Sequence, residues 1–337
     1  MKRLTVITVQ PLDLLFNWTL RVQLTNFRKY GLTENYRAII WVSKDKIKDG
    51  KPIEWEKLEE DFPEVEFIYY WDHENFLRII QNFGYIPLLR PYCLRKYFRE
   101  HPELSKDAIF YIDADVVLTK PLEINYLIDD DINYMSQAGS YTNADYFDSK
   151  IKDVLPEKIE SYKQLDVLDK TARHVGISRE ICVANNENTG AAQYLLKNLN
   201  EQYWSEVMDA CMLINVFLRG INQKYFSSTN KGFQAWCADI WAVVWTLWKR
   251  GDKTLCPKEL DFAWATDPIS KWNEVSIYHD AGAVKNSKLF NKRDEDYVNN
   301  ICTPFDKELD VDPNFCSYNY VQAIKEANPN KKKESVT

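Results

Sequence analysis

The strongest constraint on the fold is an alternation of short apolar runs with helical periods over the first 125 residues. Residues 14–32 repeat apolar side chains at helical spacing, and strand-like apolar runs occupy 3–10, 37–43, 65–71 and 108–112. Runs that are apolar at nearly every position are typical of strands in parallel sheets, which are buried on both faces. The sequence therefore predicts an α/β fold with a Rossmann-like, mostly parallel central sheet flanked by helices.

The second half of the chain is less regular, and we expect it to be an irregular, mainly helical region. Residues 143–180 are polar and predict an excursion or a flexible cover, whereas residues 200–218 predict an amphipathic helix. The segment 234–251 predicts a buried helix, because its tryptophans, Trp236, Trp241, Trp245 and Trp248, recur near helical spacing.

No internal repeat or linker divides the sequence, so we expect a single domain over residues 1–325. Its first half would be 1–125 and its second half 126–325. The polar ending at 326–337 has no apolar period and predicts a flexible tail.

Composition narrows the function classes. The formal net charge of −7 is atypical of a general nucleic-acid binder, which needs a surplus of Lys and Arg. Two local basic clusters are open to a solvated-face or a functional interpretation: Arg90, Arg95, Lys96 and Arg99, and Lys285, Lys288, Lys292 and Arg293. The seven scattered cysteines predict reduced thiols and no zinc site. The opening run is too short for a signal peptide, and no run reaches the roughly 18 apolar residues of a membrane span, so we expect a soluble, intracellular protein.

Two carboxylates follow the fourth strand-like run. Asp113 and Asp115 come directly after Ile112, at the carboxyl end of a predicted strand, where open α/β sheets bind their ligands. Alternate residues of an extended segment point the same way, so both carboxylates can address one site. Such a pair favours Mg²⁺ or Mn²⁺, which take oxygen ligands. An acidic, solvated turn is the alternative.

A second candidate segment lies far downstream. His279 directly follows the apolar run "VSIY", with Gly282 three and Lys285 six residues later. An imidazole, a close backbone approach and an ammonium at this spacing can converge on one anion and metal cluster. Taken alone, a histidine after a strand is more often a structural hydrogen-bonding residue; its pairing with Asp113 and Asp115 favours the ligand.

These motifs together resemble a known family. "FYIDADVVLTKPL" resembles the Asp-x-Asp segment of GT-A glycosyltransferases, and His279, Gly282 and Lys285 fit the H-x-x-G-x-x-K pattern of family 8 glycosyltransferases. "ENTGAAQYLLKN" resembles that family's Asn-x-Gly segment. The stretch before Asp113 is also similar to hydroxyproline arabinosyltransferases and peptidyl-serine galactosyltransferases. The likeness covers about a third of the chain and implies a GT-A fold, a UDP-sugar donor, a divalent metal and retention of anomeric configuration.

The resemblance implies roles for individual residues. Asp113, Asp115 and His279 would bind the metal, with Asp113 also near the donor ribose or sugar. Lys285 would bind the diphosphate, Gly282 would allow the close approach, and Arg90 would contact donor phosphate. Asn188 and Gly190 would lie beside the donor sugar. The family's Asp-Gln-Asp segment is replaced here by "FQAWCADIW", in which Gln234 and Asp239 are the polar candidates for catalysis; Asp267 is another, with a turn residue as its alternative.

The acceptor hydroxyl is left open by the sequence. A lipopolysaccharide precursor, a protein, a small molecule or a hydroxymethylated pyrimidine in bacteriophage DNA, taking a glucosyl or arabinosyl group, would each suit a cytoplasmic enzyme, in the host cytoplasm if phage-encoded. A nucleotidyltransferase is a rival, but "VQPLDLLFNW" lacks the Gly-rich basic loop expected after the first strand. A noncatalytic nucleotide-sugar-binding protein is a second rival, which would show no metal dependence.

Overall fold

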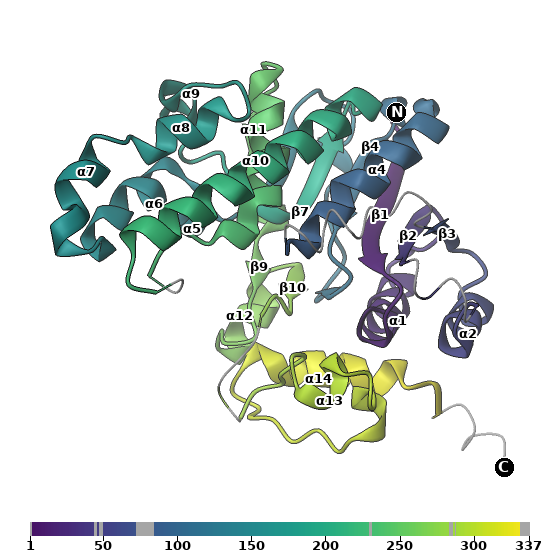
Figure 1. Ribbon diagram of the computed structural model, residues 1–337. Coiled ribbons are helices and arrows are strands. Elements are labelled where there is room, and N and C mark those ends of the chain that lie inside the picture. Colours follow the sequence, from purple (N-terminus) through teal and green to yellow (C-terminus); the bar gives the residue numbers. More distant parts are fainter. Residues whose placement is uncertain are drawn as a thin grey trace, which may run out of the picture. The chain divides into compact units, whose positions relative to one another are not determined.

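The computed structural model describes residues 2–43, 46, 50–71, 84–228, 231–282, 286 and 288–330 (Figure 1). Contacts divide the chain into two compact units, and each unit is assembled from separated stretches of sequence. Unit 1 comprises residues 1–4, 73–111 and 127–257, and unit 2 comprises residues 5–72, 112–126 and 258–337. The expected one-domain organisation, with halves at 1–125 and 126–325, stays a prediction.

Unit 2 begins with the predicted alternation of strands and helices. It contains β1 (Leu4–Pro11), α1 (Leu14–Arg28), β2 (Tyr36–Val42), α2 (Ile53–Asp61) and β3 (Glu66–Trp71). Only the first residue of β1, Leu4, is assigned to unit 1. The strand β2 lies between β1 and β3 and is parallel to both. Every residue of β2 except Arg37 is buried, which explains its apolar sequence.

A second, smaller sheet in unit 2 brings distant parts of the sequence together. It consists of β5 (Val116–Leu118), β9 (Phe262–Ala263) and β10 (Ile277–His279). The strand β10 is antiparallel to β5, with Tyr278 opposite Val117, and parallel to β9. This pairing places the segment after Asp115 beside the segment that ends at His279.

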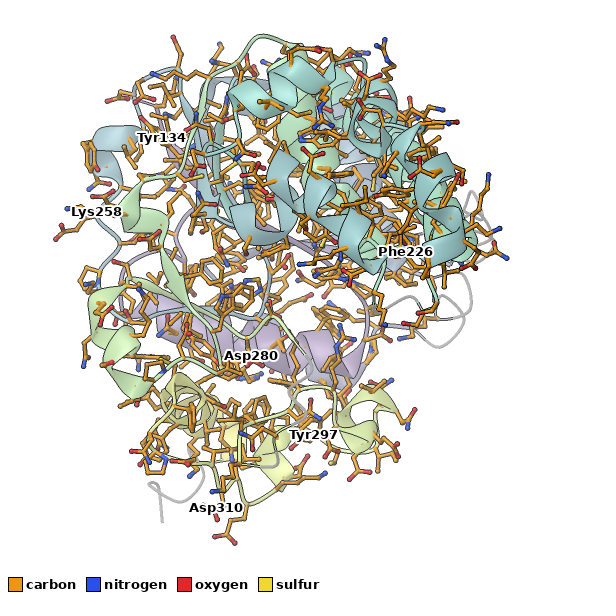
Figure 2. The ribbon with its side chains drawn as sticks, turned by 90° about the vertical axis from the view of Figure 1, so that its left-hand side faces the viewer. Tyr134, Phe226, Lys258, Asp280, Tyr297 and Asp310 are labelled. Carbon is orange, nitrogen blue, oxygen red and sulfur yellow. The ribbon has the colours of Figure 1, made fainter. Side chains whose placement is uncertain are left out.

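Helices and an aromatic core support this small sheet. The helices are α12 (Ile269–Glu274), α13 (Glu295–Val298) and α14 (Cys316–Ala327). Of the 3₁₀ turns, η4 (Asn125–Leu127) follows β5, η8 (Lys258–Leu260) precedes β9, and η9 (Pro304–Asp306) lies between α13 and α14. Trp18 of α1, Tyr278 of β10 and Tyr320 of α14 are fully buried in one cluster. Tyr297 of α13, labelled in Figure 2, meets Trp18 edge-on with ring centroids 6.1 Å apart. Because Tyr278 belongs to this core, the core fixes the strand that carries His279.

Unit 1 is built from strands and long helices. Its strands are β4 (Ala108–Ile112), β6 (Asn133–Gln137), β7 (Gly190–Lys197) and β8 (Thr254–Leu255), in the order β4-β7-β6-β8. The strand β6 is antiparallel to β7 and parallel to β8. Helix α10 (Glu201–Tyr225) packs against both α4 (Leu89–Glu100) and α11 (Ala238–Lys249). The 3₁₀ turns η2 (Ile86–Leu88) and η3 (Pro102–Lys106) lie before and after α4, and η7 (Ala235–Cys237) lies directly before α11. The predicted α/β fold, with a mixed, mostly parallel sheet flanked by helices, is confirmed.

The polar segment 143–180, for which the sequence predicts an excursion or a flexible cover, forms short helices. After α5 (Gly139–Thr142) it contains α6 (Ala144–Ser149), η5 (Lys150–Asp153), η6 (Pro156–Lys158), α7 (Ile159–Lys163) and α8 (Val167–Arg173), and the next helix is α9 (Arg179–Ala184). Phe147 and Leu168 are buried within these helices. Helices this short complete one or two turns, so an apolar period is hard to detect in the sequence.

Two other boundaries differ from the predictions. Trp236 is 57% exposed, because it lies in η7 and not in α11, whereas Trp241, Trp245 and Trp248 are buried as predicted. Helix α14 extends to the buried Ala327, so the predicted tail at 326–337 begins too early, and residues 331–337 lie outside the described part. Among the described residues, no helix combines the length and apolar character needed to cross a membrane.

Candidate metal centre

Asp113 and Asp115 lie in the short link between two buried strands. The strand β4 ends at Ile112 and β5 begins at Val116, and every residue of both strands is buried. The two carboxylate side chains keep 21% and 15% of their surface exposed. The predicted position of both residues directly after a strand is therefore confirmed.

Two amide side chains of α1 hold the backbone of this link. Gln23 donates from Nε2 to the carbonyl oxygens of Asp113, at 2.8 Å, and Val116, at 3.0 Å. Asn26 donates to the Leu118 carbonyl at 3.0 Å and accepts from the Leu118 amide at 2.7 Å. Because Gln23 and Asn26 are buried, these bonds satisfy polar groups that water does not reach, and they fix the chain from which both carboxylates project.

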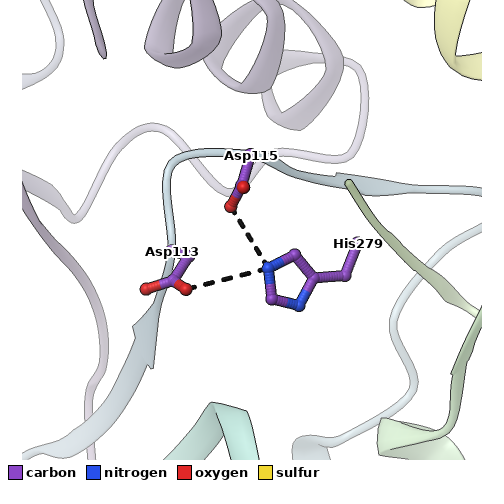
Figure 3. Close-up of side chains that lie close together, drawn as sticks. All are labelled: Asp113, Asp115 and His279. Atoms are coloured by element: carbon purple, nitrogen blue, oxygen red, sulfur yellow. Dashed lines mark ion pairs between the residues drawn. The ribbon is translucent and has the colours of Figure 1, made fainter. Parts of the chain in front are cut away.

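His279 reaches the carboxylates through the pairing of β10 with β5. It is the last residue of β10 and lies opposite Val116, and the following amide, Asp280 N, donates to the Asp115 carbonyl at 3.0 Å. Figure 3 shows the imidazole Nε2 facing both acids, 3.2 Å from Asp115 Oδ1 and 3.7 Å from Asp113 Oδ2. One ligand atom from each of these three residues lies within 4.8 Å of the others.

The face of the His279 ring is covered by aromatic side chains. Trp264 stacks on it, with ring centroids 5.9 Å apart and an interplanar angle of 18°, and Phe262 lies at 6.1 Å. Trp264 is itself held by a turn in which its amide donates to Asp267 Oδ2 at 2.8 Å. Asp267, weighed above as a catalytic candidate, thus acts as a turn residue here. The stacking restrains the plane of the His279 ring.

A lysine and a second buried acid lie behind Asp115. Lys292, only 7% exposed, donates from Nζ to Asp115 Oδ2 and to the carbonyl oxygen of Asp280. The Asp280 side chain accepts a hydrogen bond of 2.9 Å from the Tyr278 hydroxyl through Oδ1. Its other oxygen, Oδ2, is buried without a hydrogen-bond partner in the described part of the chain. Asp280 is labelled in Figure 2.

The charges around Asp115 favour its ionised form. Burial by itself raises the pKa of Asp115, but the nearby charges of Lys292 and His279 outweigh burial and bring the pKa below its usual value. For Asp280 the balance is reversed, because burial dominates over the Lys292 charge and raises its pKa to about 6. Asp115 is therefore an anion near neutral pH.

The three residues fit a divalent cation by their chemistry. Carboxylate oxygens suit Mg²⁺ and Mn²⁺, and imidazole suits first-row transition metals, so a mixed set agrees well with Mn²⁺. Asp113, Asp115 and His279 are the one group of three or more acidic, cysteine or histidine side chains within ligand spacing that the described residues contain. The acids and the histidine come from two different stretches of unit 2, residues 112–126 and 258–337.

The structure brings together two further predicted residues in unit 1. Arg90 Nη1 lies 3.1 Å from Asp239 Oδ2, and the Tyr85 hydroxyl lies 3.1 Å from Asp239 Oδ1 while accepting from the Asp239 amide at 3.0 Å. Burial, followed by the Asp239 charge, raises the pKa of Tyr85 well above its usual value. The basic and acidic candidates therefore form one half-buried ion pair on α4 and α11.

The other predicted residues occupy varied environments. Gln234 is half-buried, and its backbone N–H donates to the Tyr146 hydroxyl at 2.9 Å. Asn188 is half-buried, and its backbone carbonyl accepts from the Thr254 hydroxyl at 2.8 Å. Gly282 is exposed, and Lys285 lies outside the described residues.

Gly190 has a packing reason to be glycine. It pairs with Gln137 beside an irregularity in the β6 and β7 ladder, and a Cβ atom there would lie 2.0 Å from the Ser136 carbonyl oxygen. Nearby Ala192 has a left-handed backbone, with φ of 65°. The absence of a side chain thus permits close approach of two strands, a role independent of any sugar.

Several residues of the centre were missed by sequence reasoning. Lys292 belongs to a basic cluster that the sequence leaves open to interpretation as a solvated helix face. The structure shows that the Lys292 side chain is buried. Asp280 directly follows His279 and could have been noticed as a third acid. Gln23 and Trp264 gave no signal, because a polar residue on a helix and an aromatic residue beside a strand are common without any role in a site.

Comparisons with known proteins give only weak similarity. No protein-family model matches the chain, and no curated protein matches it in sequence. A crystal structure of the galactosyltransferase LgtC, in complex with donor and acceptor sugar analogs, aligns over 98% of this chain and 99% of its own, with a TM-score of 0.44 and 10% identity.

Two other solved structures are similar at a lower level. Mouse xyloside xylosyltransferase 1 aligns over 83% of this chain and 98% of its own, with a TM-score of 0.37 and 8% identity. The mannosyltransferase PcManGT from Pyrobaculum calidifontis, in complex with GDP-Man and Mn²⁺, aligns over 72% of each chain, with a TM-score of 0.30 and 13% identity. With every TM-score below 0.5, none of these likenesses assigns a reaction to this chain.

Proposed function

We propose that this chain is a metal-dependent glycosyltransferase of the GT-A type, which moves a sugar from a nucleoside-diphosphate sugar to an acceptor hydroxyl. The observation that carries the proposal is the convergence of Asp113, Asp115 and His279, whose ligand atoms lie within 4.8 Å of one another. The order of the Asp-x-Asp and H-x-x-G-x-x-K motifs supports the same reaction class.

The site residues divide the work of binding and charge stabilisation. Asp113, Asp115 and His279 would hold Mn²⁺ or Mg²⁺, and a bound ion supplies positive charge for the departing nucleoside diphosphate. Lys285 and Arg90 are proposed to bind donor phosphate. Because Asp113 and Asp115 are already fixed through Gln23, little reorganisation is needed when the ion and donor bind.

The sugar-facing residues are assigned by the sequence resemblance. Asn188, Gln234 and Asp239 are proposed to face the donor sugar, with Gly190 and Gly282 shaping the donor site. The proposed donor is a UDP-sugar and the proposed outcome is retention, by attack on the face from which the diphosphate departs. No side chain is assigned as a covalent nucleophile.

The acceptor is proposed only as a hydroxyl group and is best found by screening. The net charge of −7 does not favour a polyanionic acceptor. Hydroxymethylcytosine-containing DNA nevertheless belongs in the panel, with a lipopolysaccharide precursor, a protein and small-molecule alcohols. Release of UDP from a panel of UDP-sugars with MnCl₂ would identify the donor, and repeating it with each acceptor would identify the recipient.

The decisive variant is Asp115→Ala. It removes a ligand oxygen at the point where charge must be stabilised, so transfer is expected to fall by about a hundredfold or more. Asp310→Ala is the matched control, because Asp310 is an exposed acid of the same unit and should keep normal activity. Near-normal transfer by a folded Asp115→Ala variant with Mn²⁺ would exclude the metal assignment.

Calorimetry separates catalysis from simple binding. A metal-dependent enzyme should bind the UDP-sugar more tightly with Mn²⁺ present and should release UDP. Equal affinity with and without the metal, together with no UDP release from any donor, would instead identify a noncatalytic nucleotide-sugar-binding protein.

A further inference from the structure

We propose that Lys292 is a built-in counter-cation of the metal centre, which weakens the binding of a divalent ion to the donor-free protein. The inference rests on the proposed function, since it concerns the same three ligands. Lys292 is not one of them: it comes from the segment between β10 and α13, and it contacts the side of Asp115 away from His279.

The two oxygens of Asp115 have different partners. Oδ1 lies 3.2 Å from His279 Nε2, whereas Oδ2 accepts from Lys292 Nζ. A metal held by the group can therefore use Oδ1 while the ammonium keeps Oδ2, so Asp115 would be a one-oxygen ligand. The Asp280 carbonyl, which also accepts from Nζ, fixes the ammonium at this place.

The lysine changes the charge that an incoming ion meets. Asp113 and Asp115 carry two negative charges and His279 binds metal as a neutral ring, so Lys292 reduces the net charge of these four groups from −2 to −1. Lys292 is buried, with 8% of its side chain exposed, and solvent screens it poorly. Its repulsion of a divalent ion is therefore larger than that of a surface lysine.

The magnitude of this repulsion decides which effect of Lys292 dominates. Even with water-like screening, a unit charge about 5 Å from a divalent ion changes its affinity by about tenfold, and the weaker screening at a buried site makes the change larger. Loss of a residue that orients a ligand typically weakens metal binding by about ten- to hundredfold. At the low exposure of Lys292, the charge effect should exceed the orienting effect. An ion held this weakly would depend on the diphosphate oxygens of the donor for further ligands.

The test is to titrate the full chain with Mn²⁺ in the absence of donor. Electron paramagnetic resonance measures the Mn²⁺ that stays free, and so gives the affinity. Lys292→Gln removes the charge but keeps a hydrogen-bond donor, and Lys292→Met is a second neutral variant. Lys292→Arg keeps the charge and serves as the matched control. We expect Lys292→Gln to bind Mn²⁺ at least about tenfold more tightly than wild type, Lys292→Met to bind more tightly as well, and Lys292→Arg to stay within about threefold.

The outcomes separate this inference from the proposed function. If wild type binds Mn²⁺ and neither neutral variant binds it more tightly, the counter-cation role is wrong while the metal site stands. If Lys292→Arg tightens binding as much as Lys292→Gln, charge is not the cause, and the role is again wrong. If wild type binds no Mn²⁺ and Asp115→Ala behaves identically, the metal site itself is wrong, and this inference is overturned with it.

Discussion

Replacing Gln23 by leucine tests whether α1 fixes the metal-binding link. The substitution places an apolar side chain of similar size in this fully buried position and removes the side-chain amide. The carbonyl oxygens of Asp113 and Val116 then lose their donors at 2.8 Å and 3.0 Å. Each buried acceptor left without its partner costs about 1–3 kcal/mol, so the variant should lose about 2–6 kcal/mol of unfolding free energy.

The loss at Gln23 should be seen in two measurements. Urea unfolding followed by tryptophan fluorescence gives the free energy, and Mn²⁺ titration should show about ten- to hundredfold weaker binding, because the carboxylates are no longer held in place. Gln202→Leu is the control, since Gln202 is exposed on α10 and its side chain donates to Glu206 Oε1 at 2.9 Å. A loss below about 1 kcal/mol in Gln23→Leu, or a loss no larger than that of Gln202→Leu, would refute the reasoning.

Two further predictions concern packing and thiols. Gly190→Ala should lower the free energy of unfolding by about 3 kcal/mol or more, measured by heat or urea, because the new Cβ would lie 2.0 Å from a backbone oxygen. Gly220→Ala is the control on α10, where a Cβ meets nothing within 4 Å, and it should stabilise the protein by about 1 kcal/mol. Equal stability of the two variants would contradict this prediction. Ellman's reagent at pH 8 should label at most Cys256 and Cys302 in the folded chain, because the other five cysteines are buried. Burial also raises the pKa of the Cys182 thiol to about 12, which disfavours its reactive thiolate. After unfolding without reductant, all seven cysteines should react. Fewer than seven reactive thiols after unfolding would indicate a disulfide.

The strands and the three candidate ligands could be predicted because their signals are local. A buried strand such as β2 needs a continuous apolar run, and Asp113 and Asp115 stand where that type of run ends. His279 follows an apolar run of its own. Its pairing with Asp115 is predicted from the residue types and supported by the family resemblance, and the structure provides the physical link, the register between β10 and β5.

The groups that complete the centre could not be predicted because their roles depend on tertiary contacts. Lys292 becomes buried only when its segment folds against Asp115 and Asp280. Gln23 has the sequence properties of any polar helix residue until β5 lies beside α1. Trp236 illustrates the opposite error, since its spacing fits the α11 face although the helix begins two residues later.

The pairing of β5 with β10 has a consequence for the order of events during synthesis. Asp115 and His279 are separated by about 160 residues, yet β5, which directly follows Asp115, pairs with β10, which ends at His279. Bringing such distant segments together carries a loop-closure cost in chain entropy. A growing chain that has emerged only to residue 257, where unit 1 ends, still lacks β9, β10 and the helices α13 and α14, and both of these helices pack against α1. The metal ligands therefore assemble late, and the α1 surface that becomes the core of unit 2 is without its cover until then.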